Sequence, residues 1–93
     1  MEIEQIEEEN KGRFEAIENK KQAGKITYTW AGQHKIIIDH TEVNPDFKGE
    51  GVAKKILNAT IDFAKENKLK VIPLCPFAKS VIEKTPEYQE VLA

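Results

Sequence analysis

The chain has 93 residues, of which 40% are hydrophobic and 32% charged, and it carries a formal net charge of −2. This length and composition fit one globular domain over residues 1–93, while the near-balance of charge and the single arginine, Arg13, argue against a nucleic-acid partner. One cysteine excludes an internal disulfide framework, and with only two histidines we expect no metal. The free thiol and an acidic N-terminus unlike a signal peptide predict a cytoplasmic protein, and the lack of a long apolar stretch predicts no membrane partner.

The first half of the chain has the alternating polar and apolar residues of β-strands. We expect strands at Met1–Glu8, Arg13–Glu18, Lys25–Ala31 and His34–Val43, separated by turn-forming residues. The last of these contains the apolar run Ile36–Ile38, which is typical of a central strand covered on both faces. By simple alternation, His40 falls on the same face as Ile36 and Ile38.

The second half predicts a helix, a strand and further helices. The expected elements are a loop at Asn44–Gly51, an amphipathic helix at Gly51–Glu66, a strand at Val71–Cys75, a helix at Pro76–Lys84 and a short helix after Pro86. The long helix joins two strands that we expect to be parallel neighbours, because it forms a β-α-β crossover. The sequence therefore predicts an α+β fold, a mostly antiparallel sheet of about five strands with one crossover and short C-terminal helices.

A glycine-containing loop opens the long helix. Unpaired N–H groups and the positive end of the helix dipole favour an anion at this position. Gly49 and Gly51 allow close approach of a phosphate, and Lys48, Lys54 and Lys55 add positive charge. The Walker and dinucleotide-binding motifs are both absent. Either the loop binds a phosphate-bearing ligand, or its glycines only shape a tight turn.

Cys75 and His40 are the candidate catalytic residues. Cys75 is expected to end a strand at the edge of the helix that begins near Pro76, where the helix dipole favours a thiolate. His40 is expected near the end of the neighbouring parallel strand, in the region where such sheets commonly bind ligands. The two could form a nucleophile–base pair. The alternative is that Cys75 is a small buried hydrophobe and His40 a core histidine.

The run Lys48-Gly49-Glu50-Gly51-Val52-Ala53 resembles the Arg/Gln-x-x-Gly-x-Gly/Ala signature of the GNAT superfamily of N-acetyltransferases. Lys48, Gly51 and Ala53 match its defined positions. Nearly the whole sequence looks like a small branch of minimal GNAT-like domains, whose recurring features are His40, the loop Gly49–Ala53 and Cys75. The chain lacks the helical insertion after the first strand and the last two strands of ordinary members, which shape the acceptor site.

The resemblance implies acetyl-coenzyme A as acyl donor, with its pyrophosphate on the backbone amides of the loop and its thioester between the two parallel strands. The cofactor-binding residues it implies are Thr41, Val43, Lys48, Gly49, Glu50, Gly51, Val52, Ala53 and Lys54. We expect an acetyl-coenzyme A-dependent N-acetyltransferase with an unidentified acceptor. The acidic N-terminus could attract a cationic amine or peptide as that acceptor, but a run of this kind is more often a solvated edge strand whose charge discourages aggregation. The alternatives are a non-catalytic acyl-coenzyme A-binding module and a protein-interaction domain.

Overall fold

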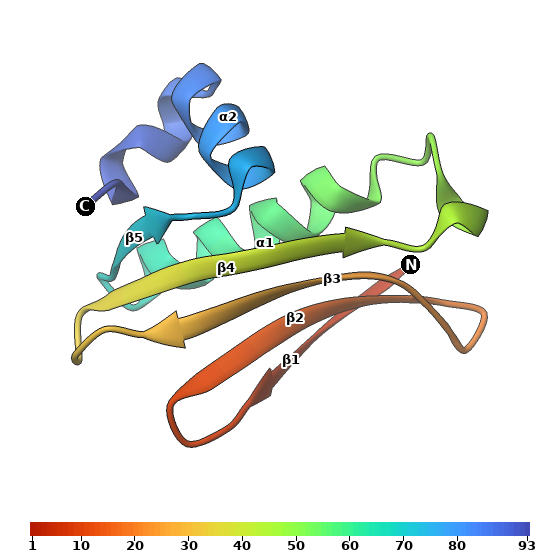
Figure 1. Cartoon of the computed structure of the whole chain (residues 1–93), viewed down its shortest axis with the longest axis horizontal. Helices are drawn as coiled ribbons and strands as arrows, with labels where there is room; N and C mark the ends of the chain where they lie inside the picture. The colour runs from red at the N-terminus through yellow and green to blue at the C-terminus, as the bar shows by residue number, and fades with distance from the viewer.

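The computed structural model describes all 93 residues and contains one five-stranded sheet with the order β1-β2-β3-β4-β5. The strands span Glu2–Glu7 (β1), Lys11–Glu18 (β2), Lys21–Trp30 (β3), Lys35–Val43 (β4) and Lys70–Pro73 (β5). The helices span Val52–Glu66 (α1) and Pro76–Lys84 (α2), with 3₁₀ turns at Pro45–Phe47 (η1) and Pro86–Val91 (η2). Strands β1 to β4 pair antiparallel and β5 pairs parallel with β4, so the predicted fold class and its β-α-β crossover are confirmed (Figure 1).

The hydrophobic core lies on one face of the sheet. Helix α1 packs against β2, β3 and β4, and its buried Ile56 and Ile61 join sheet residues such as Ile26 in a single cluster of 18 residues. Figure 1 shows α1 crossing behind the sheet, with α2 and the C-terminus beside β5. The opposite face carries polar side chains, because an antiparallel sheet can leave one face to water. No helix has the length and apolar character needed to span a membrane.

The central strand is β3, so the expectation that the isoleucine-rich strand is central and covered on both faces is wrong. In β4, Ile36 and Ile38 are fully buried, but Ile37 points the other way and is only half-buried. Ile37 lies opposite Ile72 of β5 on that face. Its apolar character therefore reflects contact with a neighbouring strand and not a second covering layer.

Strand β3 begins at Lys21 instead of Lys25, and Gly24 within it fixes the position of α1. A Cβ atom at Gly24 would lie 2.7 Å from the carbonyl oxygen of Glu42 and 2.9 Å from Cγ1 of Val52. Only glycine therefore allows the first turn of α1 to rest directly on β3 at this point. This close approach sets where α1 begins relative to the end of β4.

Candidate functional site

The loop between β4 and α1 is shaped by its own polar contacts and two left-handed glycines. The Asn44 side chain accepts a hydrogen bond from the Asp46 N–H at 2.9 Å, which starts the 3₁₀ turn. Gly49 and Gly51 have φ angles of 86° and 70°, a region that favours glycine. A Cβ atom at either position would meet no protein atom within 4 Å. The space beside both glycines is therefore open to a ligand.

The first turn of α1 presents unpaired N–H groups next to these glycines. Helix α1 has Gly51 as its N-cap and no acidic residue in its first turn. The Lys55 N–H donates to the Gly51 carbonyl at 3.1 Å, whereas Val52, Ala53 and Lys54 precede the first intrahelical bond and have no acceptor. Together with the positive end of the helix dipole, these donors form a site for an anion.

Two backbone N–H groups of the predicted cofactor-binding residues already make hydrogen bonds within the loop. The Lys48 N–H donates to the Pro45 carbonyl at 3.2 Å, and the Glu50 N–H donates to the Phe47 carbonyl at 3.3 Å. The available donors are those of Gly49, Gly51 and the first helical turn. The exposed Lys48 and Lys54 side chains add positive charge nearby.

Strands β4 and β5 separate after a short parallel ladder. The ladder ends with Ile38 opposite Pro73. The N–H groups of Leu74 and Cys75 then both donate to the Ile38 carbonyl, at 3.1 and 3.2 Å. Proline lacks a backbone donor, which suits the residue at which a ladder stops.

Beyond this point, β4 has an open edge. The Asn44 N–H donates to the Ala23 carbonyl of β3 at 2.8 Å. Because backbone groups alternate in direction along a strand, those of Val43 and Thr41 point away from β3, toward the side that β5 no longer covers. Of these two predicted cofactor-binding residues, Val43 therefore has both backbone groups free for a ligand, whereas the Thr41 N–H faces the Cys75 thiol and only its carbonyl is free.

Cys75 lies where the two strands separate, as the N-cap residue of α2 and not as the end of β5. It is only 6% exposed, and its Sγ lies 3.2 Å from Oγ1 of Thr41. Burial raises the pKa of the thiol, but the Thr41 hydroxyl and the N–H dipoles of Ala78, Phe77 and Thr41 outweigh it, so the pKa falls below its ordinary value. The Thr41 hydroxyl is the one side chain in hydrogen-bonding contact with the thiol.

A β-bulge in β4 places His40 on the open face of the sheet, and the prediction that it shares a face with the buried isoleucines is wrong. Ile38 pairs with Tyr28 and His40 pairs with Thr27, although the two β4 residues are separated by Asp39. The extra residue reverses the alternation of side chains beyond it.

The structure consequently brings Cys75 together with Thr41 instead of His40. The His40 side chain is 62% exposed, and its Nε2 lies 3.4 Å from Oε1 of Glu42. A catalytic role for His40 stays a prediction, with the ring acting from the open face. Sequence reasoning assigned Thr41 to the cofactor and missed its hydroxyl contact, because alternation without a bulge points that side chain to solvent.

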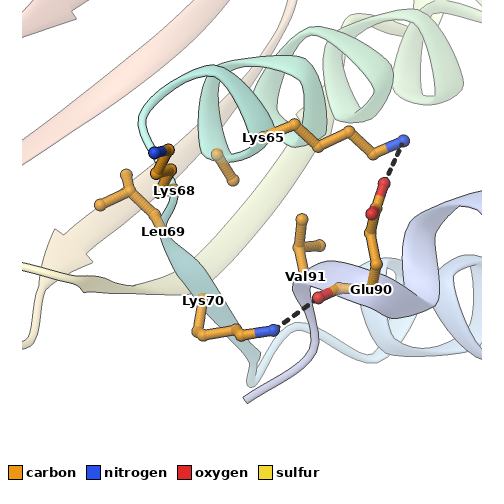
Figure 2. A pocket seen from close by; sticks show the side chains of 7 residues that line it. Lys65, Lys68, Leu69, Lys70, Glu90 and Val91 are labelled. Carbon is orange, nitrogen blue, oxygen red and sulfur yellow. Dashed lines mark hydrogen bonds and ion pairs between the residues drawn. The ribbon is translucent and has the colours of Figure 1, made fainter.

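A separate hollow of about 240 Å³ lies at the far end of α1, where Lys65, Lys70 and Glu90 converge (Figure 2). Lys65 Nζ lies 3.1 Å from Glu90 Oε1, and Lys70 Nζ donates to the Glu90 carbonyl oxygen at 2.6 Å. Both ammonium groups therefore have partners, and these contacts fasten η2 against α1 and β5. The chain has no group of three or more His, Cys, Asp or Glu side chains that could bind a metal ion.

Residues 13–91 match the family model of the GCN5-related N-acetyl-transferases. The chain belongs to this family. It is 31% identical over 61 residues to Protein NATD1 of Xenopus tropicalis and 30% identical over 61 residues to Protein NATD1 of Homo sapiens. Both alignments cover 66% of this chain but only 56% and 54% of the two relatives, so the chain spans about half their length.

Three solved structures have a fold similar to that of this chain. The solution structure of a GCN5-like protein from Staphylococcus aureus is 41% identical with a TM-score of 0.71, covering 97% of this chain and 87% of that one. Ribosomal-protein-alanine N-acetyltransferase from Brucella melitensis biovar Abortus 2308 has a TM-score of 0.69 at 19% identity, covering 92% and 64%. A streptothricin acetyltransferase-like protein from Bacillus anthracis, solved with acetyl coenzyme A, has a TM-score of 0.61 at 19% identity, covering 73% and 40%. The last two share the fold alone.

Proposed function

We propose that this GCN5-related protein binds acetyl-coenzyme A and transfers the acetyl group to an amine acceptor. The observation that carries the proposal is the position of the free first-turn donors of α1 next to the open edge of β4. The pyrophosphate would accept hydrogen bonds from Gly51, Val52 and Ala53, and the pantetheine amides would pair with the Thr41 carbonyl and the backbone of Val43. A protein of the same fold has been solved with acetyl coenzyme A, which supports this choice of ligand.

We propose Cys75 as the nucleophile that first receives the acetyl group. Its thiolate attacks the carbonyl carbon of acetyl-coenzyme A, the bond to the coenzyme sulfur breaks, and the departing coenzyme thiolate takes a proton from water. The acceptor amine then attacks the Cys75 thioester and regenerates the thiol. This route needs a reduced cysteine, which supports the cytoplasmic location that we also propose.

A non-catalytic coenzyme A-binding module is the second candidate. Strands β1 and β2 are joined by the short segment 8–10, and the sheet ends at β5. No helix or strand therefore encloses the open face of the sheet as an acceptor site. Coenzyme binding without release of free coenzyme A in the presence of a panel of cationic amines and peptides would favour this candidate.

Gly51→Val tests the binding site by isothermal titration calorimetry with coenzyme A. The branched side chain fills the space beside the first-turn amides and disfavours the left-handed backbone, so binding should be lost. Gly32 is a matched control, because it also has a left-handed φ, 83°, and nothing within 4 Å of a Cβ atom. Gly32→Val should therefore show comparable strain and wild-type affinity.

Two results would contradict the proposal. Unchanged affinity in a folded Gly51→Val variant would refute the placement of the pyrophosphate. The absence of heat with millimolar coenzyme A or acetyl-coenzyme A and the wild-type chain would refute both candidate functions together.

A further inference from the structure

We propose that Thr41 is the positioning residue of Cys75, with its hydroxyl directing the sulfur toward the gap where β4 and β5 separate. The inference rests on the proposed acetyl transfer. The partner of the Cys75 thiol on β4 is then Thr41, and not the adjacent His40.

The geometry begins with the bulge at Asp39. By adding one residue to β4, the bulge moves Thr41 to the face of Ile38, opposite Ile26 of β3. Thr41 and Cys75 are 34 positions apart in the sequence, yet Oγ1 and Sγ are separated by 3.2 Å. A β-branched side chain has few accessible rotamers, so little entropy is lost in keeping the hydroxyl at this distance.

The hydroxyl distinguishes between the two protonation states of the sulfur. A neutral thiol can donate to Oγ1 or accept from it, whereas a thiolate can only accept, so the Thr41 O–H favours the charged form. Burial raises the pKa of Cys75, and the groups that lower it are the Thr41 hydroxyl and the amides of Ala78, Phe77 and Thr41, all of them uncharged.

No charged side chain of β4, β5, α1 or α2 contributes to this pKa. His40 and Glu42, which flank Thr41, point to the open face of the sheet. The thiolate is thus favoured by hydrogen bonding instead of by an ion pair, and the Thr41 hydroxyl is the one side-chain contributor. In the transfer itself Thr41 stays neutral, because the thiol proton passes to water and the coenzyme thiolate takes one up.

The first test follows the titration of Cys75 without coenzyme. Because the chain has one cysteine, labelling its Cβ with ¹³C yields one resonance whose shift reports the thiol–thiolate equilibrium. Thr41→Val removes the hydroxyl at constant volume and should raise the titration midpoint. Thr41→Ser should restore it, and Thr27→Val, a control on the open face of β3, should leave it unchanged. A folded Thr41→Val variant that titrates at the wild-type midpoint would overturn the inference.

The second test measures the rate of Cys75 acetylation by acetyl-coenzyme A against pH. At neutral pH the rate in Thr41→Val should fall roughly tenfold, as expected for loss of a hydrogen bond to a charged group. The difference should shrink as alkaline pH drives both proteins to the thiolate, whereas a merely structural role would lower the rate equally at every pH and would overturn the inference. If Thr41→Val does not fold, Thr41→Ala takes its place under the same criteria.

The two tests separate this inference from the proposed function. A raised midpoint in Thr41→Val together with no acetylation of the wild-type chain would support Thr41 as the partner of the thiol and refute acetyl transfer through Cys75. An unchanged midpoint with normal acetylation would overturn the role of Thr41 alone.

Discussion

Gly24→Ala should destabilise the protein by displacing the start of α1. The added Cβ would lie 2.7 Å from the carbonyl oxygen of Glu42, 2.9 Å from Cγ1 of Val52 and 3.1 Å from Cδ1 of Ile56. The Glu42 carbonyl is backbone of β4, so its overlap can be relieved only by a local shift in the pairing of β3 with β4. Val52 and Ile56 are 1% and 0% exposed and have little room to move, so the remaining overlap displaces α1 from β3, and the first-turn amides with it.

The expected loss of stability is moderate. Overpacking of this kind costs roughly 1–3 kcal/mol. Replacing glycine also reduces the freedom of the unfolded chain, which returns roughly 0.4–1 kcal/mol. The net destabilisation should be about 1–2 kcal/mol, which for a domain of this size lowers Tm by roughly 10 °C.

A double-mutant cycle can attribute this loss to the contact with α1. Thermal and urea unfolding of Gly24→Ala, Val52→Ala and the double variant should give a coupling of roughly 1 kcal/mol, because Val52→Ala removes one of the overlapping atoms. The same cycle with Val91→Ala, in η2 near the far end of α1, should be additive. Unchanged stability in Gly24→Ala, or equal coupling in both cycles, would refute the argument that glycine permits this close packing.

Incubation of the wild-type chain with acetyl-coenzyme A should add one acetyl group by intact-mass spectrometry, removable by a thiol reagent and absent in Cys75→Ala. Base-stable acetylation on lysines that persists in Cys75→Ala would leave Cys75 as a packing residue. Glu90→Gln should lower stability by less than about 1 kcal/mol in urea unfolding, because the Lys65 and Glu90 side chains are 33% and 68% exposed and Lys70 binds the backbone carbonyl. A much larger loss would show that the ion pair, and not the burial of Val91, attaches η2.

Local physical rules made the glycine-containing loop before α1 predictable from the sequence. Gly49 and Gly51 precede an amphipathic run, and both adopt the left-handed conformation that glycine permits. The helix begins at Val52, one residue after the predicted boundary. Pro76 likewise marked the start of α2 and placed Cys75 at its N-terminus, because proline suits the first helical turn.

Tertiary structure decided which side chains meet at the site. Sequence periodicity assumes an uninterrupted strand, and one bulge residue, Asp39, reverses that periodicity over the rest of β4. It therefore exchanges the faces of His40 and Thr41, and brings Thr41 to Cys75. Whether a bulge forms depends on the pairing of β4 with β3, a non-local interaction with no signature in the residues of β4 themselves.

The sequence by itself determined the strand-rich first half, the crossover and the loop at the start of α1, because each depends on residues that are neighbours in the chain. The position of β3 at the centre of the sheet, the packing of α1 on Gly24 and the contact between Thr41 and Cys75 were decided by the tertiary structure. Each of these joins segments that are distant in sequence, and their distances depend on strand register and close packing instead of local conformational preference.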